Sequence, residues 1–321
     1  AVAGREAGCY SLLYRHSWRN VMYINHNGMA TNVANTLTGH YGNLQTSTQR
    51  LSSGMRINSA ADDAAGLAIS ELMRADVAAL NQGVRNANDG ISLIQTADGA
   101  LGVIDEKLIR MKELAEQAAT GTYDSTQRLM IESEYQQMAS EITRIANATD
   151  FNGIKLLDGT LSAMNGADGK IHDGSQLTAQ GALKVHFGTA NDSAEDYYYI
   201  EIGDCTASAL GVGISARAGA AGSTISTQQA AQEALVAINN AIVSKDKIRA
   251  HLGAMQNRLE NTVTNLTVQS ENLQAAESRI RDVDVATEMT NFVRNQVLTQ
   301  SAVAMLSQAN SMPQMALQLI G

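Results

Sequence analysis

The chain has 321 residues, a net charge of −9, a single proline (Pro313), and aromatic residues at only 4% of positions. Proline breaks helices and aromatic side chains fill thick cores, so this composition favours long helices over a compact globule. The acidic balance, without clustered basic residues, argues against a nucleic-acid partner. No apolar run approaches the length of a membrane span.

Residues 1–21 differ from the rest of the chain. They contain three arginines, Cys9 and Trp18, but no helical period. We interpret them as a non-native or disordered extension, such as upstream sequence translated before a start near Met22; a native disordered arm is the alternative. Cys9 and Cys205 provide neither a disulfide framework nor a metal-binding spacing.

The two ends of the chain share an absence of charge. There is no Asp, Glu, Lys or Arg from Asn20 to Gln49, and none after Arg294, although apolar residues recur at helical spacing in both segments. Exposed helices normally carry Lys and Glu for solubility. A buried unpaired charge is costly, whereas amides and hydroxyls can pair with one another.

We therefore predict that residues 22–61 and 284–321 form terminal helices of an inner domain, buried against many neighbours. The alternative is a pair of low-charge disordered tails. The residues expected in the buried core are Leu37, Leu44, Leu51, Phe292, Val303, Leu306 and Leu317.

A long helix is predicted after the first end segment, within residues 62–160. It should run from Ile69 to Ala118, with Asn58 or Ser59 as the cap. A shorter helix follows, capped by Asp124 or Ser125.

The second long helix lies within residues 225–283 and repeats an apolar residue at every seventh position, as coiled coils do. Lys245 is the polar exception in its first row, and Thr262 and Gln269 are exceptions in its second row. The first row, which we expect to form the seam, contains Ile238, Leu252, Leu259, Leu266, Leu273 and Ile280. Because the two long helices match in length and are traversed in opposite directions, they should pack antiparallel as an outer coiled-coil domain.

Residues 161–224 lose the helical period. The segments 184–187 and 197–202 alternate like strands, which predicts a small β-hairpin and a short variable region. The fold class is therefore mainly α: a long antiparallel coiled-coil bundle with a small β-hairpin region.

Catalytic and metal-binding patterns are weak in this sequence. The histidines are scattered, and no His-Glu-x-x-His pair offers a zinc site. Asp282, Asp284 and Glu288 could be read as a calcium cluster, but solvated carboxylates between two helices explain them better. We expect no catalytic site, no metal and no cofactor.

Several ordered motifs closely resemble bacterial flagellin. They are LSSGMRINSAADDAAGLAI at 51–69, RNANDGIS at 85–92, FNGIKLLDG at 151–159, LGAMQNRL at 252–259 and SRIRDVD at 278–284. The resemblance covers residues 22–160 and 225–321, and the central region is too short for the large variable domains of many flagellins.

The resemblance implies a subunit that is exported without a cleaved signal and polymerises with itself into the flagellar filament used for motility. It also implies an export chaperone at the C-terminal end, and hook-junction and cap proteins as partners. A hook–filament junction protein of the same superfamily, or a secreted adhesin or enzyme built on flagellin arms, are the alternatives.

The family also engages an innate immune receptor through its long helices. The resemblance places Arg110, Leu114 and Glu134 on the family's contact positions. Lys112 stands where many recognised flagellins have Arg, and Glu116 where they have an apolar residue. Since Lys lacks the planar guanidinium fork, this contact should be weakened.

Overall fold

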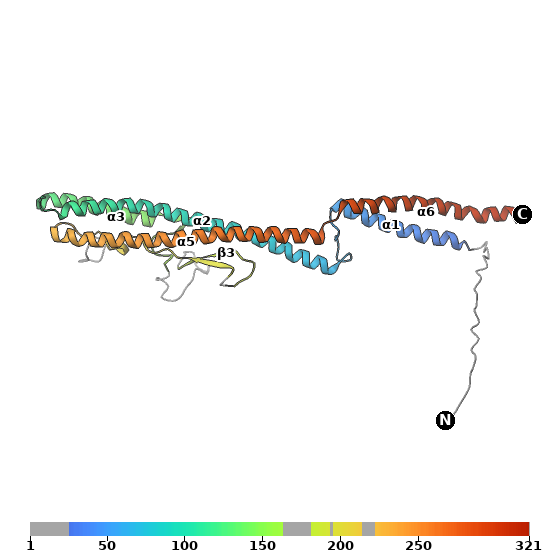
Figure 1. The fold of residues 1–321 in the computed structure, drawn as a ribbon, viewed down its shortest axis with the longest axis horizontal. Coiled ribbons are helices and arrows are strands. Elements are labelled where there is room, and N and C mark those ends of the chain that lie inside the picture. Colours follow the sequence, from blue (N-terminus) through green and yellow to red (C-terminus); the bar gives the residue numbers. More distant parts are fainter. Residues whose placement is uncertain (1–25, 163–180, 193–194, 214–221, 321) are drawn as a thin grey trace, which may run out of the picture. The chain divides into compact units, whose positions relative to one another are not determined.

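The computed structural model describes residues 26–162, 181–192, 195–213 and 222–320 (Figure 1). The helices are α1 (Gly28–Ser53), α2 (Ala64–Ala119), α3 (Ser125–Ala148), α4 (Ala207–Leu210), α5 (Gln228–Arg281) and α6 (Val285–Ile320). The strands are β1 (Asp150–Phe151), β2 (Ile154–Lys155), β3 (Leu183–His186) and β4 (Tyr197–Ile200). The extension predicted at residues 1–21 lies outside the described residues, as do residues 163–180, 193–194 and 214–221 of the predicted hairpin and variable region.

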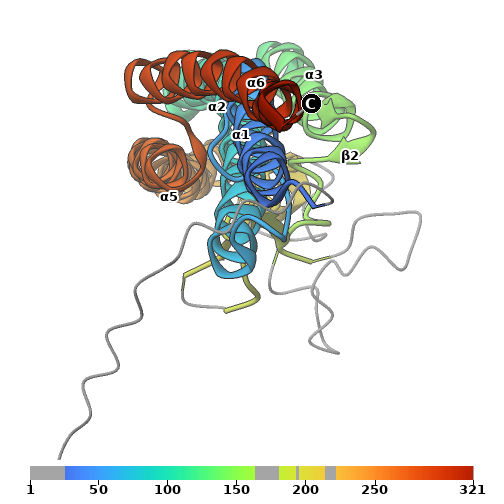
Figure 2. The same cartoon turned by 90° about the vertical axis from the view of Figure 1, so that its right-hand side faces the viewer.

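The chain divides into two units, one built from both ends of the sequence and one that runs from Ala68 to Ile280. In the first unit, α1 and α6 lie side by side (Figures 1 and 2). Asn27 caps α1 by accepting a hydrogen bond from the Ala30 N–H at 3.0 Å. Gly54, with φ of 72°, ends the helix in the left-handed conformation that favours glycine.

The segments that adjoin α1 and α6 pair through their backbones. The Arg56 N–H donates to the Arg281 carbonyl oxygen at 2.6 Å, and the Val283 N–H donates to the Gly54 carbonyl oxygen at 3.0 Å. Asp284 then caps α6, accepting from the Thr287 hydroxyl at 2.7 Å.

The start of α2 differs from the sequence prediction. Asp63, not Asn58 or Ser59, provides the cap, since its carboxylate accepts from the Gly66 N–H at 2.9 Å. Asp62 instead holds the preceding turn by accepting from the Asn58 and Ser59 N–H groups.

The second unit is a bundle of α2, α3 and α5 with a small β region. Helix α2 has 56 residues and α5 has 54, so each is about 80 Å long. Of the two predicted caps of α3, Asp124 and Ser125, the structure shows Asp124, which forms a capping box with Gln127. The buried core draws on all three helices, including Leu101 from α2, Tyr135 from α3 and Leu252 from α5. The predicted fold class is confirmed.

The β region packs on this bundle as two antiparallel hairpins. The β1–β2 turn contains Asn152 and Gly153, both with positive φ, which suits an Asn-Gly hairpin turn. In β3–β4, Val185 pairs with Tyr198, and the guanidinium of Arg258 lies 4.1 Å from the centre of the Tyr198 ring. On the other face of the hairpin, Lys184 Nζ lies 3.5 Å from the centre of the Tyr197 ring.

On α5, the first heptad row is buried over most of its length, whereas the second row leaves the buried face. Ile238, Leu252, Leu259 and Leu266 are buried, while Leu273 and Ile280 are half-buried. Gln269, expected in the second row, is exposed, and the neighbouring Ser270 is buried. A straight helix turns once per 3.6 residues, so a strict seven-residue pattern rotates away from the seam over several turns.

Candidate functional site

The structure separates the predicted end-helix residues into two groups. Leu37, Leu44 and Leu51 are half-buried at seven-residue intervals on α1, and Phe292 and Leu306 are half-buried on α6. Ser47, Thr299 and Ala309 are buried near them. Because α1 and α6 are paired in this unit, we assign these positions to the α1–α6 seam.

The other predicted residues on α6 face solvent. Val303 is 47% exposed and Leu317 is 54% exposed. Further exposed apolar residues on this helix were not in the predicted set: Val285, Val293, Val297, Leu298, Met305 and Met315. For the residues after Arg294, the signal that could have found them is the lack of any charged residue in the rest of α6, since a helix that is apolar on all sides is a buried helix.

Several hydroxyls on the polar surface of α1 bond within the helix. The hydroxyls of Thr36, Thr38, Thr46 and Thr48 each donate to the carbonyl oxygen four residues earlier, at 2.8–3.0 Å. Such a hydroxyl already has a partner, so burying it costs less than burying a free donor. The exposed faces of α1 and α6 are therefore suited to burial against protein.

Charges in this unit lie at the ends of the two helices that adjoin the backbone pairing. Arg50 Nη1 lies 3.9 Å from the buried carboxylate of Glu288. Asp284 has its pKa lowered by the hydrogen bond from the Thr287 hydroxyl and by nearby backbone N–H groups. Because Asp284 caps α6, the structure explains it as a helix cap rather than as a calcium ligand. Among the described residues there is no group of three or more His, Cys, Asp or Glu side chains that could hold a metal ion.

The three residues placed on the family's receptor-contact positions do not share one surface. Arg110 is about half exposed and donates to the Glu134 carboxylate of α3 at 2.8 Å and to Glu113 at 2.9 Å. Hydrogen bonds from Arg110 to Glu134 and Glu113 raise the pKa of Arg110. Leu114 is only 1% exposed and belongs to the bundle core.

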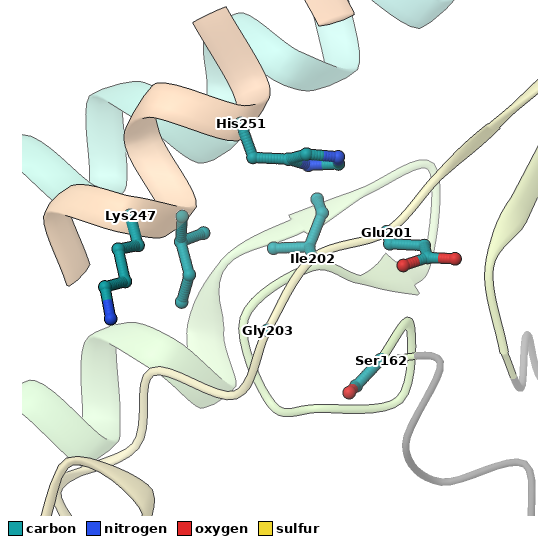
Figure 3. Close-up of a pocket in the computed structure, with 7 residues that line it drawn as sticks. Ser162, Glu201, Ile202, Gly203, Lys247 and His251 are labelled. Carbon is teal, nitrogen blue, oxygen red and sulfur yellow. The ribbon is translucent and has the colours of Figure 1, made fainter. Parts of the chain in front are cut away.

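A surface cleft of about 260 Å³ lies where α5 meets the segment after β4 (Figure 3). Ser162, Glu201, Lys247 and His251 contribute its polar groups. Figure 3 shows Lys247 extending away from Glu201 and His251, so these charged groups do not converge on one point. The cleft therefore lacks the arrangement of a catalytic or ligand-binding centre.

These features define a class: an α-helical structural subunit whose paired end helices carry few charges and expose apolar residues. Within the described residues, no helix is long and apolar enough to cross a membrane.

Comparison with known proteins identifies the family. Residues 24–162 match the model of the bacterial flagellin N-terminal helical region, and residues 235–320 match that of the C-terminal helical region. The chain is 43% identical over 302 residues to flagellin of Halalkalibacterium halodurans, covering 93% of this chain and 100% of that protein. It is 43% identical over 310 residues to flagellin of Bacillus subtilis, with the same coverages. The chain belongs to the bacterial flagellin family and is a subunit of the extracellular flagellar filament.

A solved structure shows the same fold at lower identity. The putative flagellar hook-associated protein from Vibrio parahaemolyticus aligns with a TM-score of 0.50 at 15% identity, covering 69% of this chain and 100% of that one. At this identity the likeness concerns the fold alone. The much higher identity to flagellins agrees with a filament subunit, and nothing favours a hook–filament junction protein or an adhesin.

Proposed function

We propose that α1 and α6 are the part of the subunit that is buried in the filament core. In this proposal, residues 22–61 and 284–321 form the inner domain, and residues 62–160 and 225–283 form the coiled-coil outer domain. The α1–α6 seam, which contains Leu37, Leu44, Leu51, Phe292 and Leu306, holds the pair together within one subunit. Val303 and Leu317 contact neighbouring subunits.

The observation that carries this proposal is the exposure of apolar residues along α6, a helix that has no charged residue after Arg294. Val285, Met289, Val293 and Val297 follow one another at four-residue intervals on α6, and all are exposed. Contiguous apolar surface of this kind marks a protein-interaction site. Chains related by a helical repeat can cover it completely, because heterologous contacts continue without closing.

A matched pair of valine substitutions tests the proposal. Val303→Lys on α6 and Val243→Lys on α5 both change an exposed valine, at 47% and 51% exposure. In the monomer both changes should be nearly neutral. In the filament, Val303→Lys should bury an unpaired charge, and a penalty of about 4 kcal/mol would weaken each association step roughly a thousandfold.

Seeded assembly, followed by light scattering and electron microscopy, provides the measurement. Val303→Lys should fail to elongate seeds, while Val243→Lys should elongate them nearly normally. Equal elongation by both variants would show that this part of α6 is not buried in the filament core. Leu37→Asp should also block assembly, but it should weaken the α1–α6 pair as well, because Leu37 is half-buried in the seam.

We further propose that the C-terminal part of α6 binds an export chaperone before assembly, and that the end helices contact hook-junction and cap proteins in the filament. The exposed apolar residues Met315 and Leu317 support this, since a chaperone would cover surface that is later buried. Binding of this chaperone should be lost when residues 303–321 are deleted and retained in Val243→Lys.

An innate immune receptor is a further proposed partner, at Arg110 and Glu134. Their ion pair is exposed and bridges α2 and α3, which supports recognition of the two side chains together. Leu114 supports the helix from within the core. Arg110→Ala should reduce receptor activation, whereas Arg144→Ala, which removes another exposed arginine paired with a glutamate, should not. Equal receptor activation by the two variants would exclude Arg110 and Glu134 as the contact surface.

We propose that the chain has no catalytic activity and needs no cofactor. The separated charges of the cleft in Figure 3 support this view.

A further inference from the structure

The seam between α2 and α5 is mostly apolar, but it also contains a hydrogen bond from Ser270 to Asn81 and a layer of charge at Lys245. Lys245 occupies the row that Ile238 and Leu252 share, and its side chain is 2% exposed. Lys245 Nζ lies 2.6 Å from Asp105 Oδ1 on α2 and 2.7 Å from Asp246 Oδ1. Burial acts to lower the pKa of Lys245, but hydrogen bonds to the two carboxylates outweigh it and raise the pKa. The lysine is therefore a buried cation that depends on its partners.

A second ion pair lies one helical turn further along α5. Arg249 Nε donates to Asp98 Oδ1 at 2.7 Å, and Arg249 Nη2 donates to Asp98 Oδ2 at 3.1 Å. This two-point contact fixes orientation as well as distance. The α2 partners, Asp98 and Asp105, are seven residues apart, which is one heptad.

The surrounding apolar packing repeats with the same period on both helices. The buried residues of α2 at this spacing are Leu80, Ala87, Ile94, Leu101 and Leu108. Those of α5 include Leu252, Leu259 and Leu266. If one helix slipped past the other by seven residues, apolar side chains would still meet apolar side chains. The apolar seam therefore discriminates poorly between neighbouring registers.

The two ion pairs, in contrast, distinguish the native register from the registers shifted by one heptad. A slip of one heptad toward the C-terminus of α2 would bring Arg249 to Asp105, but it would place Lys245 against Lys112. A slip of one heptad toward the N-terminus of α2 would bring Lys245 to Asp98, but it would place Arg249 against Ile91. In the first slip the buried Lys245 would keep only Asp246 of its own helix and would face a second lysine, which is strongly destabilising; in the second slip the partly exposed Arg249 would lose its carboxylate at a smaller cost.

We propose that the pairs Lys245–Asp105 and Arg249–Asp98 specify the register of α2 against α5, a choice that the heptad-spaced apolar residues leave open. A subunit that packs against many copies of itself needs one register in every copy, because a one-heptad slip moves the helix surfaces by about 10 Å.

The sharpest test moves the two carboxylates by one heptad. The double variant Ile91→Asp/Asp105→Leu offers both cations a carboxylate of α2 only in the slipped register, where Lys245 meets Asp98 and Arg249 meets the new aspartate. Spin labels on cysteines at the exposed positions Asn88 and Val243, in a Cys9→Ser background, report the axial offset by electron–electron double resonance. The inter-label distance should shorten by about 10 Å, seven residues at 1.5 Å each.

Ile91→Asp alone is the matched control, because it leaves both native pairs intact and should keep the parent distance. An unchanged distance in the folded double variant would overturn the proposal and assign the register to other contacts, such as those of the β region. Should the double variant not fold, a neutral variant serves instead: Asp98→Asn, Asp105→Leu, Lys245→Leu and Arg249→Gln. It should give more than one inter-label distance, and a single parent distance there would equally overturn the proposal.

Discussion

Asn27 supplies the hydrogen bond that Pro313 withholds. Proline has no N–H, so Pro313 inside α6 leaves the carbonyl oxygen of Ala309, four residues earlier, without its helical donor. Asn27 Nδ2 donates to that oxygen at 2.7 Å. The same side chain caps α1 through its oxygen. The side chain of Asn27 thus caps α1 and supplies the hydrogen bond that α6 lacks at Ala309.

Asn27→Asp should separate these two roles, since a carboxylate keeps the cap but cannot donate to Ala309. The loss of the donor leaves a part-buried carbonyl unpaired, at a cost of about 1–3 kcal/mol. Hydrogen exchange of the α6 amides near Ala309 should accelerate. In a Pro313→Ala background the N–H of residue 313 restores the helical bond, so the effect of Asn27→Asp should largely vanish. An equal effect of Asn27→Asp with and without Pro313 would contradict the idea that Asn27 compensates for the proline.

Two glycines of α2 should respond to alanine in opposite directions. A Cβ at Gly83 would lie 2.0 Å from the carbonyl oxygen of Phe187, whereas a Cβ at Gly102 would meet nothing within 4 Å. Gly102→Ala should stabilise the protein by about 0.5–1 kcal/mol through helix propensity. Gly83→Ala should destabilise it by about 1–3 kcal/mol, because the backbone after β3 must move. Denaturant unfolding would measure both, and a stabilising Gly83→Ala would refute the close contact.

Acid should weaken the Arg249–Asp98 pair. The hydrogen bond from Arg249 holds the pKa of Asp98 below its ordinary value, against the opposing effect of burial. A lowered folded-state pKa means that the pair contributes stability above the unfolded value of about 3.9 and loses it as pH falls through the folded value. Asp98→Asn should therefore be less stable at neutral pH, by at most about 1 kcal/mol because the pair is partly solvated. The difference should shrink as pH falls through the lowered pKa of Asp98, and a pH-independent difference would contradict this origin.

Cys205 should be unreactive in the folded protein. It is fully buried, and desolvation, with a smaller effect from Asp204, raises the pKa of its thiol to about 12. Since the thiolate is the nucleophile, iodoacetamide at pH 8 should leave Cys205 unmodified in the native chain and modify it in guanidinium. Peptide mass spectrometry measures this, with the unfolded sample as the control. Rapid native modification would show that the β region opens.

The sequence by itself predicted most of the helices, because heptad and helical periods are local and the apolar face of each helix can be read from its own residues. It also predicted the uncharged ends, the hairpin and the first seam row. The seven-residue row of α5 was identified with Lys245 as its one polar exception, but sequence spacing could not say whether that lysine is solvated or buried against Asp105.

Only the tertiary structure determined which residues of distant segments pack against one another. Whether Leu114 lies in the core or on the surface, and whether Leu37 is half-buried while Val303 is exposed, depends on how each helix is rotated and on what packs beside it. The same holds for the bond from Asn27 to Ala309, which joins residues 282 positions apart. A periodic pattern states that a helix has a face to bury; it does not state which of several equivalent registers or neighbours will cover that face. Those choices rest on contacts between distant segments, which exist only once the chain has folded.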